Sequence, residues 1–203
     1  MLAFAPAGTF WVMTFQDIIV MNAELTVDPM IRSLVERHRD EDTGHEHWFL
    51  ADLERVFGTQ PTSVLTLFSS ETRPVRAVSF GLAAEVFNIQ DDVLRLVFLE
   101  VLEAAAGVYF AGISRALSLA GHADKLRYFA GDHLQAEASH ELHGAASTPI
   151  EAIILSPGQR KAAKDLSDRM FGRFADLGNA LLESFARPPS GTTEPIERKS
   201  EGE

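Results

Sequence analysis

Two short stretches of the sequence place histidines and carboxylates at helical spacing. In one of them, His133, Glu137 and His140 are separated by four and then three positions, so on an α-helix they lie within about 60° of one another. Apolar residues precede them on the same face, which predicts that this face is turned toward a core. Buried ionisable groups are costly unless they are paired or bound to a cation. Taken alone, the stretch is as compatible with a solvated face as with a metal site.

The second stretch repeats this spacing with His38, Asp42 and His45. It interrupts an apolar stripe that begins before it and continues after it, and six of the seven histidines lie in or beside the two stretches. Two facing helices that each offer two imidazoles and a carboxylate can form a metal site inside a helical bundle. Nitrogen and oxygen ligands without sulfur suit iron or manganese, and zinc is compatible. Together the two stretches favour a metal site over a structural role.

The periodicity predicts an all-α protein, because no stretch alternates with period two between turn signals. The second helix should begin at Asp28 and Pro29, an N-cap followed by a proline, and end at Gly58. Gly44 lies inside this helix, where glycine costs about 1 kcal/mol relative to alanine; a close contact or room for a ligand would explain it. The helices are expected over residues 10–25, 29–57, 74–88, 91–120, 122–144 and 157–186, with a short one between 59 and 68.

One carboxylate on the helix expected over 91–120 is a further candidate ligand. Glu103 falls on the apolar stripe of that helix with Leu96 and Leu99, so it is expected to face inward. Glu100 lies three positions earlier and is not excluded by the pattern.

Composition bounds the class of protein. The chain has 203 residues, of which 46% are hydrophobic and 23% charged, enough for one well-buried domain, expected over 1–186. Residues 187–203 are rich in proline, glycine and charge and are expected to be a disordered tail. The net charge of −11 argues against a nucleic-acid surface. A homodimer is compatible with the long apolar helices.

The absence of cysteine excludes disulfides and thiol chemistry and is consistent with a cytoplasmic protein. Residues 1–15 contain no lysine or arginine, so the positively charged start of a signal peptide is missing. The apolar run over 10–21 is too short to span a bilayer. These observations predict a cytoplasmic location without membrane insertion.

Residues 40–58 (DEDTGHEHWFLADLERVFG) and 126–140 (LRYFAGDHLQAEASH), with Glu103 in a Val-Leu-Glu context, form a pattern that resembles a known family. It is similar to the haem-oxygenase-like (TenA-like) α-helical bundle, and within it to the iron-containing redox enzymes, the haem-oxygenase-like di-iron oxidases. The order and spacing of the expected helices match over about residues 28–186.

The resemblance implies metal ligands at His45, Glu103, His133, Glu137 and His140. A sixth ligand in that family is usually a glutamate one or two turns before the early histidine, whereas here His38 stands seven residues before His45, and Asp42 or Glu41 could substitute. The resemblance therefore implies one or two iron ions that activate O2 on a small organic substrate. The residues available to line an apolar substrate pocket include Trp48, Phe49, Tyr109 and Phe110.

Other functions of the same fold stay open. A thiaminase-type hydrolase resembles enzymes with a cysteine nucleophile, which this chain lacks. A haem oxygenase would leave both histidine stretches unexplained. A metal-free oxidase of the quinone-synthase type could use histidines alone, and a non-catalytic interaction protein could retain the fold. The substrate is also open, since amino acids, fatty acids and small aromatic acids all suit an apolar pocket over iron.

Overall fold

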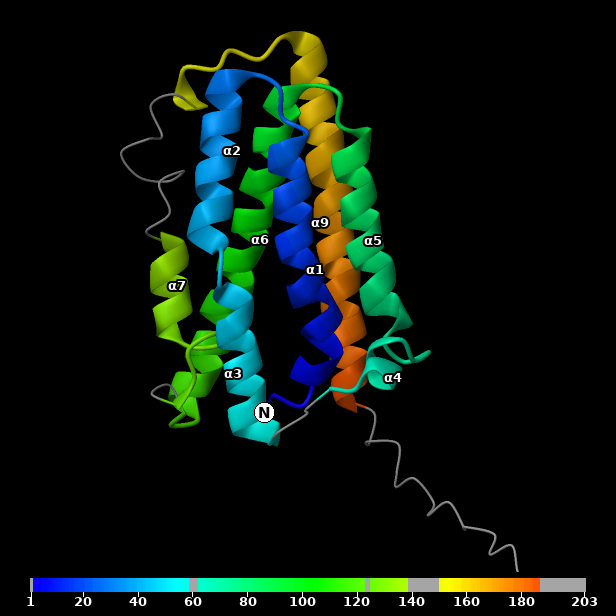
Figure 1. Ribbon diagram of the computed structural model, residues 1–203, viewed down its shortest axis with the longest axis vertical. Coiled ribbons are helices and arrows are strands. Elements are labelled where there is room, and N and C mark those ends of the chain that lie inside the picture. Colours follow the sequence, from blue (N-terminus) through cyan, green and yellow to red (C-terminus); the bar gives the residue numbers. More distant parts are fainter. Residues whose placement is uncertain (1, 59–61, 123–124, 139–149, 187–203) are drawn as a thin grey trace, which may run out of the picture.

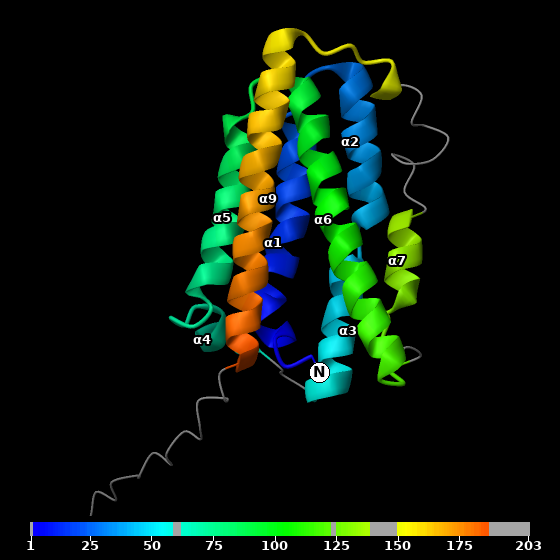
Figure 2. The ribbon, with the colours of Figure 1, turned by 180° about the vertical axis from the view of Figure 1, so that it is seen from behind.

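The computed structural model describes residues 2–58, 62–122, 125–138 and 150–186, and over these residues it is all-helical (Figure 1). This confirms the predicted all-α class. The long helices run side by side along the long axis, and α7 packs against α6 (Figures 1 and 2). The helices are α1 (Ala5–Glu24), α2 (Pro29–Asp42), α3 (His45–Phe57), α4 (Val64–Leu67), α5 (Arg73–Asn88), α6 (Asp92–Leu119), α7 (Gly131–Ala138) and α9 (Pro157–Ala186).

The helix expected over 29–57 is two helices, so that prediction was wrong at its centre. It begins as expected, with the Asp28 carboxylate accepting hydrogen bonds from the backbone of Met30 and Ile31. The chain then leaves the helix at Thr43, and Gly44 has a φ of 100°. Glycine adopts a positive φ without a steric penalty, so the chain can turn there and restart as α3 at His45.

The helix expected over 122–144 is also shorter than predicted. Its described part is helical only from Gly131 to Ala138, and residues 125–130 follow an irregular path. Residues 139–144 lie outside the described part of the chain, as does the tail expected over 187–203. The first helix begins at Ala5, five residues earlier than expected.

The apolar core is divided between two clusters of buried side chains. The larger one joins α1, α2, α5, α6 and α9 around residues such as Leu82, Leu99 and Met170. The smaller one lies between α1, α3, α6 and the segment before α7, and it includes Phe49, Phe110 and Phe129. The side chains discussed below as a candidate site lie close to this second cluster.

An ion-pair network around a buried carboxylate links α5 to α9. Glu85 is 5% exposed and accepts hydrogen bonds from Arg169 and Arg173. Burial by itself would raise the pKa of Glu85, but the hydrogen bonds from the two arginines outweigh it and leave the pKa below its ordinary value. Gly81, one turn earlier on α5, leaves room for this network, since a Cβ there would stand 2.2 Å from the guanidinium of Arg173.

Helix α6 is long and apolar enough to cross a membrane by length and composition alone, and 39% of its most apolar window is buried within the protein. A core helix of a soluble protein passes the same test. Glu103 lies near the middle of this helix and is 7% exposed.

Candidate metal centre

His38, Asp42 and Glu103 form a buried cluster between α2 and α6. Their exposed fractions are 0%, 2% and 7%. Each can offer one ligand atom, and these atoms all lie within 4.8 Å of one another. His38 and Asp42 are one turn apart on α2, and Glu103 reaches them from the middle of α6. Helix α6 is therefore the element that brings a second buried carboxylate to the histidine.

The imidazole of His38 lies between the two carboxylates. Its Nε2 is 2.5 Å from Oε1 of Glu103, and its Nδ1 is 3.4 Å from Oδ2 of Asp42. The other Asp42 oxygen, Oδ1, is 3.3 Å from Nδ1 of His45. Within the described residues, Oδ2 of Asp42 is buried without a hydrogen bond. Two buried carboxylates require compensating positive charge, from a protonated imidazole or a cation.

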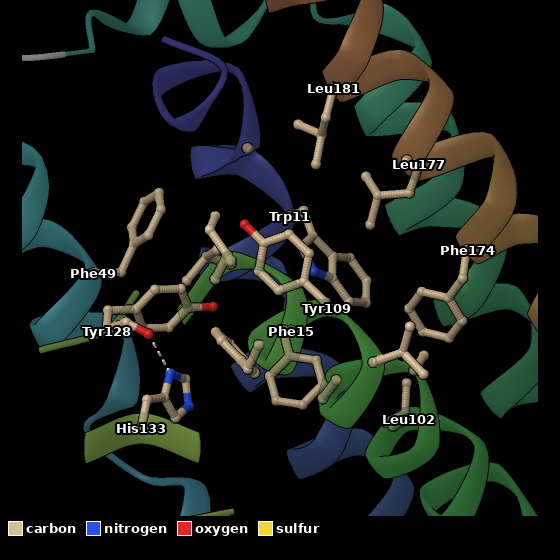
Figure 3. A pocket seen from close by; sticks show the side chains of 18 of the residues that line it. Trp11, Phe15, Phe49, Leu102, Tyr109, Tyr128, His133, Phe174, Leu177 and Leu181 are labelled. Atoms are coloured by element: carbon tan, nitrogen blue, oxygen red, sulfur yellow. Dashed lines mark hydrogen bonds between the residues drawn. The ribbon is translucent and has the colours of Figure 1, made fainter. Parts of the chain in front are cut away.

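His45 and His133 extend the cluster toward α7. Their ring centroids are 4.6 Å apart. Nδ1 of His133 lies 2.8 Å from the carbonyl oxygen of Tyr128 (Figure 3). A carbonyl oxygen can only accept, so Nδ1 carries the proton and donates it. In the neutral ring Nε2 then holds the lone pair, and metal-binding histidines typically donate their other ring N–H to a backbone carbonyl in this way. The ring of Phe110 packs on the same imidazole, with centroids 3.9 Å apart.

Asp52 of α3 holds the irregular segment that carries the chain into α7. Its carboxylate is 3% exposed and accepts hydrogen bonds from the backbone N–H groups of Arg127, Tyr128 and Phe129, at 2.8–3.2 Å. Successive N–H groups that converge on one anion form a nest. Sequence reasoning did not assign Asp52 a role, although an aspartate on the apolar stripe of Phe49 and Leu53 was a signal that it is buried.

A cavity of about 720 Å³ adjoins the cluster. It lies between α1, α3, α6, α9 and the segment before α7, and most of its lining is apolar. Asp42, His45, Glu103 and His133 form part of its wall. His133 and Tyr128 lie on one side and Phe174, Leu177 and Leu181 on the opposite side (Figure 3).

The residues expected in a substrate pocket divide between two pockets of the structure. Phe49, Tyr109 and Phe110 line the cavity. The Trp48 ring packs on the His45 ring, with centroids 4.4 Å apart. The Arg127 guanidinium lies over the Trp48 ring, 3.7 Å from its centroid. Trp48 lines a smaller pocket with Asp52.

Two of the expected ligands, Glu137 and His140, have side chains outside the described part of the structure. The backbone of Glu137 belongs to α7, whereas all of His140 lies outside the described part. Glu41 and Glu100 are partly exposed. The part of the chain that the structure describes thus brings together His38, Asp42, Glu103, His45 and His133 from α2, α3, α6 and α7.

The donor set fits a transition metal, because imidazole nitrogens and carboxylate oxygens are ligands that iron, manganese and zinc accept. Oδ2 of Asp42, which is buried without a hydrogen bond, also favours a bound cation. A scan against models of protein families found no match, and a search of curated proteins found no similar chain.

Proposed function

We propose that this chain is an iron-dependent oxidase or oxygenase that uses O2 to oxidise a small organic substrate in the cavity. The observation that carries the proposal is the buried cluster of His38, Asp42 and Glu103, whose ligand atoms lie within 4.8 Å of one another. The resemblance to haem-oxygenase-like di-iron oxidases supports it, and the haem-oxygenase-like fold is part of the proposal. One or two iron ions are compatible with this donor set, and manganese or zinc could occupy it.

Asp42 and Glu103 would supply the negative charge that holds the ion, with His38, His45 and His133 as the neutral donors around them. Glu137 and His140 complete the ligand set that the resemblance implies. When bound, Fe(II) would supply the redox chemistry and leave positions for O2 and substrate. The aromatic rings around His45 and His133 would exclude water from this end of the cavity, and the hydrogen bond to Tyr128 would hold the His133 ring in one orientation.

A metal-free oxidase is the second candidate, and one observation favours it. Both nitrogens of His38 lie near carboxylate oxygens, at 2.5 Å and 3.4 Å. A protonated His38 would therefore balance part of the buried negative charge without an ion. In that case the same residues would bind and deprotonate a polar group of the substrate.

Metal uptake separates the two candidates. Anaerobically prepared protein given Fe(II) is expected to bind about one or two ions and to change its absorbance on exposure to air. Glu103→Gln keeps the side-chain volume but removes the charge, so it should weaken Fe(II) binding at least about tenfold. Glu54→Gln, which makes the same change at an exposed carboxylate on α3, is the matched control and should bind like the wild type. An unaltered affinity in Glu103→Gln, or no uptake by the wild type, would contradict the proposal.

Histidine variants provide a second control on the same ion. His45→Ala and His133→Ala should each lose most metal affinity while far-UV circular dichroism stays near that of the wild type. His47→Ala is the control on α3, because the His47 side chain is 78% exposed. If both site variants unfold while the control does not, these histidines are mainly structural.

A further inference from the structure

The polar groups of the cavity are gathered at the end where the candidate metal centre lies. Besides the buried histidines and carboxylates, Gln16 and Glu46 line this end. Gln16 donates a hydrogen bond to the Asp42 carbonyl, and Glu46 accepts one from the Gly44 backbone. The wall contributed by α9 is apolar, with Phe174, Leu177 and Leu181 facing the space opposite His133 (Figure 3). The space therefore has one polar end and one apolar end.

No lysine or arginine is among the described residues that line the cavity. The charged groups at its polar end are carboxylates, and those of Asp42 and Glu103 together balance one divalent ion. An anionic headgroup would therefore meet no surplus positive charge in this wall and would lie close to Glu46. Tyr109, which also lines the cavity, contributes a phenol hydroxyl that is neutral at physiological pH.

The exposed side chains of the cavity lining on α6 and α9 are apolar as well. Val108 on α6 is 78% exposed, and Leu182 and Phe171 on α9 are 69% and 46% exposed, and all three line the space. Helices α6 and α9 separate toward the C-terminal end of α6 (Figures 1 and 2). An apolar molecule that approaches from this side would meet these three exposed apolar side chains. The volume of about 720 Å³ falls within the range of small-molecule sites.

The geometry points to a substrate that is a neutral, elongated apolar molecule with one uncharged polar end, such as an alcohol or aldehyde, rather than a carboxylic acid or amino acid. The oxidation of this molecule rests on the proposed function, whereas its binding in the cavity requires no metal. The polar end would lie beside His133 and Glu103, and the apolar chain would extend toward Leu177 and Leu181 on α9.

The test compares two probes of equal chain length, 1-decanol and decanoate, by isothermal titration calorimetry on the full chain with a chelator present. We expect 1-decanol to bind at least tenfold more tightly than decanoate. Equal affinities, or tighter binding of decanoate, would overturn the inference. Binding of neither probe by protein that still takes up Fe(II) would overturn it too, while leaving the metal proposal intact. Binding of 1-decanol by protein that takes up no iron would sustain the inference and reject the metal.

Paired glycine variants locate the bound probe. Gly178 lines the cavity from α9, and a Cβ there would meet no atom within 4 Å, so Gly178→Leu would place a side chain in the open space. Gly172, six residues earlier, is exposed and unobstructed like Gly178, but it is not among the residues that line the cavity. Both changes replace a helical glycine by leucine, which favours the helix. Gly178→Leu should weaken 1-decanol binding at least tenfold and Gly172→Leu should not; equal affinities in the two variants would overturn the placement.

Discussion

The carboxylate of Asp52 should be one of the largest single contributors to the stability of the site. Removing it leaves the buried N–H groups of Tyr128 and Phe129 without their acceptor. A hydrogen bond to a charged group is worth about 1.5–3 kcal/mol, so Asp52→Ala should lower the free energy of unfolding by about 3–6 kcal/mol. The bond from the Arg127 backbone is left out of this sum, because Arg127 is exposed and its N–H can donate to water instead of Asp52. Asp52→Asn keeps one acceptor oxygen and should lose about half as much.

Urea denaturation followed by circular dichroism would measure the loss, with Glu54→Gln as the control. Glu54 is an exposed carboxylate two residues further along α3, and its substitution should change stability by less than about 0.5 kcal/mol. Hydrogen exchange in a peptide spanning residues 125–131 should become faster in Asp52→Asn than in the control. A loss below about 1 kcal/mol together with unchanged exchange would refute the view that Asp52 anchors this segment.

Three other predictions concern parts of the fold outside the cavity. The pKa of Glu85 is lowered in the folded protein. The Glu85 carboxylate therefore stabilises the fold above the ordinary pKa of a glutamate, and this stabilisation is lost as the pH falls through the lower folded pKa. The stability of Glu85→Gln against acid should accordingly depend less on pH than that of the wild type. Gly44→Ala should lower the free energy of unfolding by about 1–2 kcal/mol in urea titrations, because alanine at a φ of 100° is strained; no loss would mean that the turn relaxes. Gly81→Ala should lower the free energy of unfolding of the wild type, because the new Cβ displaces the Arg173 guanidinium. In an Arg173→Ala background the same change should raise that free energy by about 1 kcal/mol, because alanine favours a helix. An equal change in both backgrounds would contradict the steric clash with Arg173.

The sequence was sufficient to predict the class and most helices, because apolar stripes and terminal residues are local signals. The Asp28–Pro29 start is one example, and the inward position of Glu103 on its stripe is another. The single helix expected over 29–57 was wrong because the penalty for glycine inside a helix is small, and only the tertiary fold decides that Gly44 turns the chain. The irregular path of residues 125–130 depends on Asp52, which is more than seventy positions away in the sequence, and periodicity carries no information about such a partner.

The candidate site could be predicted as two sets of residues but not as a geometry. The spacing of His38, Asp42 and His45 indicated a shared face, whereas the 2.5 Å approach of His38 to Glu103 depends on how α2 packs against α6. The sequence suggested Trp48 as a wall of the pocket because it follows His45 by about one turn. In the structure Trp48 packs on His45 and Arg127, and it lines a smaller pocket instead of the cavity. Whether the cluster binds iron stays a prediction.

The turn at Gly44 divides the donors between two helices. His38 and Asp42 move with α2, whereas His45 moves with α3, and only Thr43 and Gly44 separate the two helices. Rotation about these two residues would change the separation between Asp42 and His45, now 3.3 Å, without repacking the interior of either helix. If the proposed site binds an ion, a change in backbone torsion at these two residues would be the most local way to fit the distance between these two donors to its radius, because Glu103 belongs to a third helix, α6.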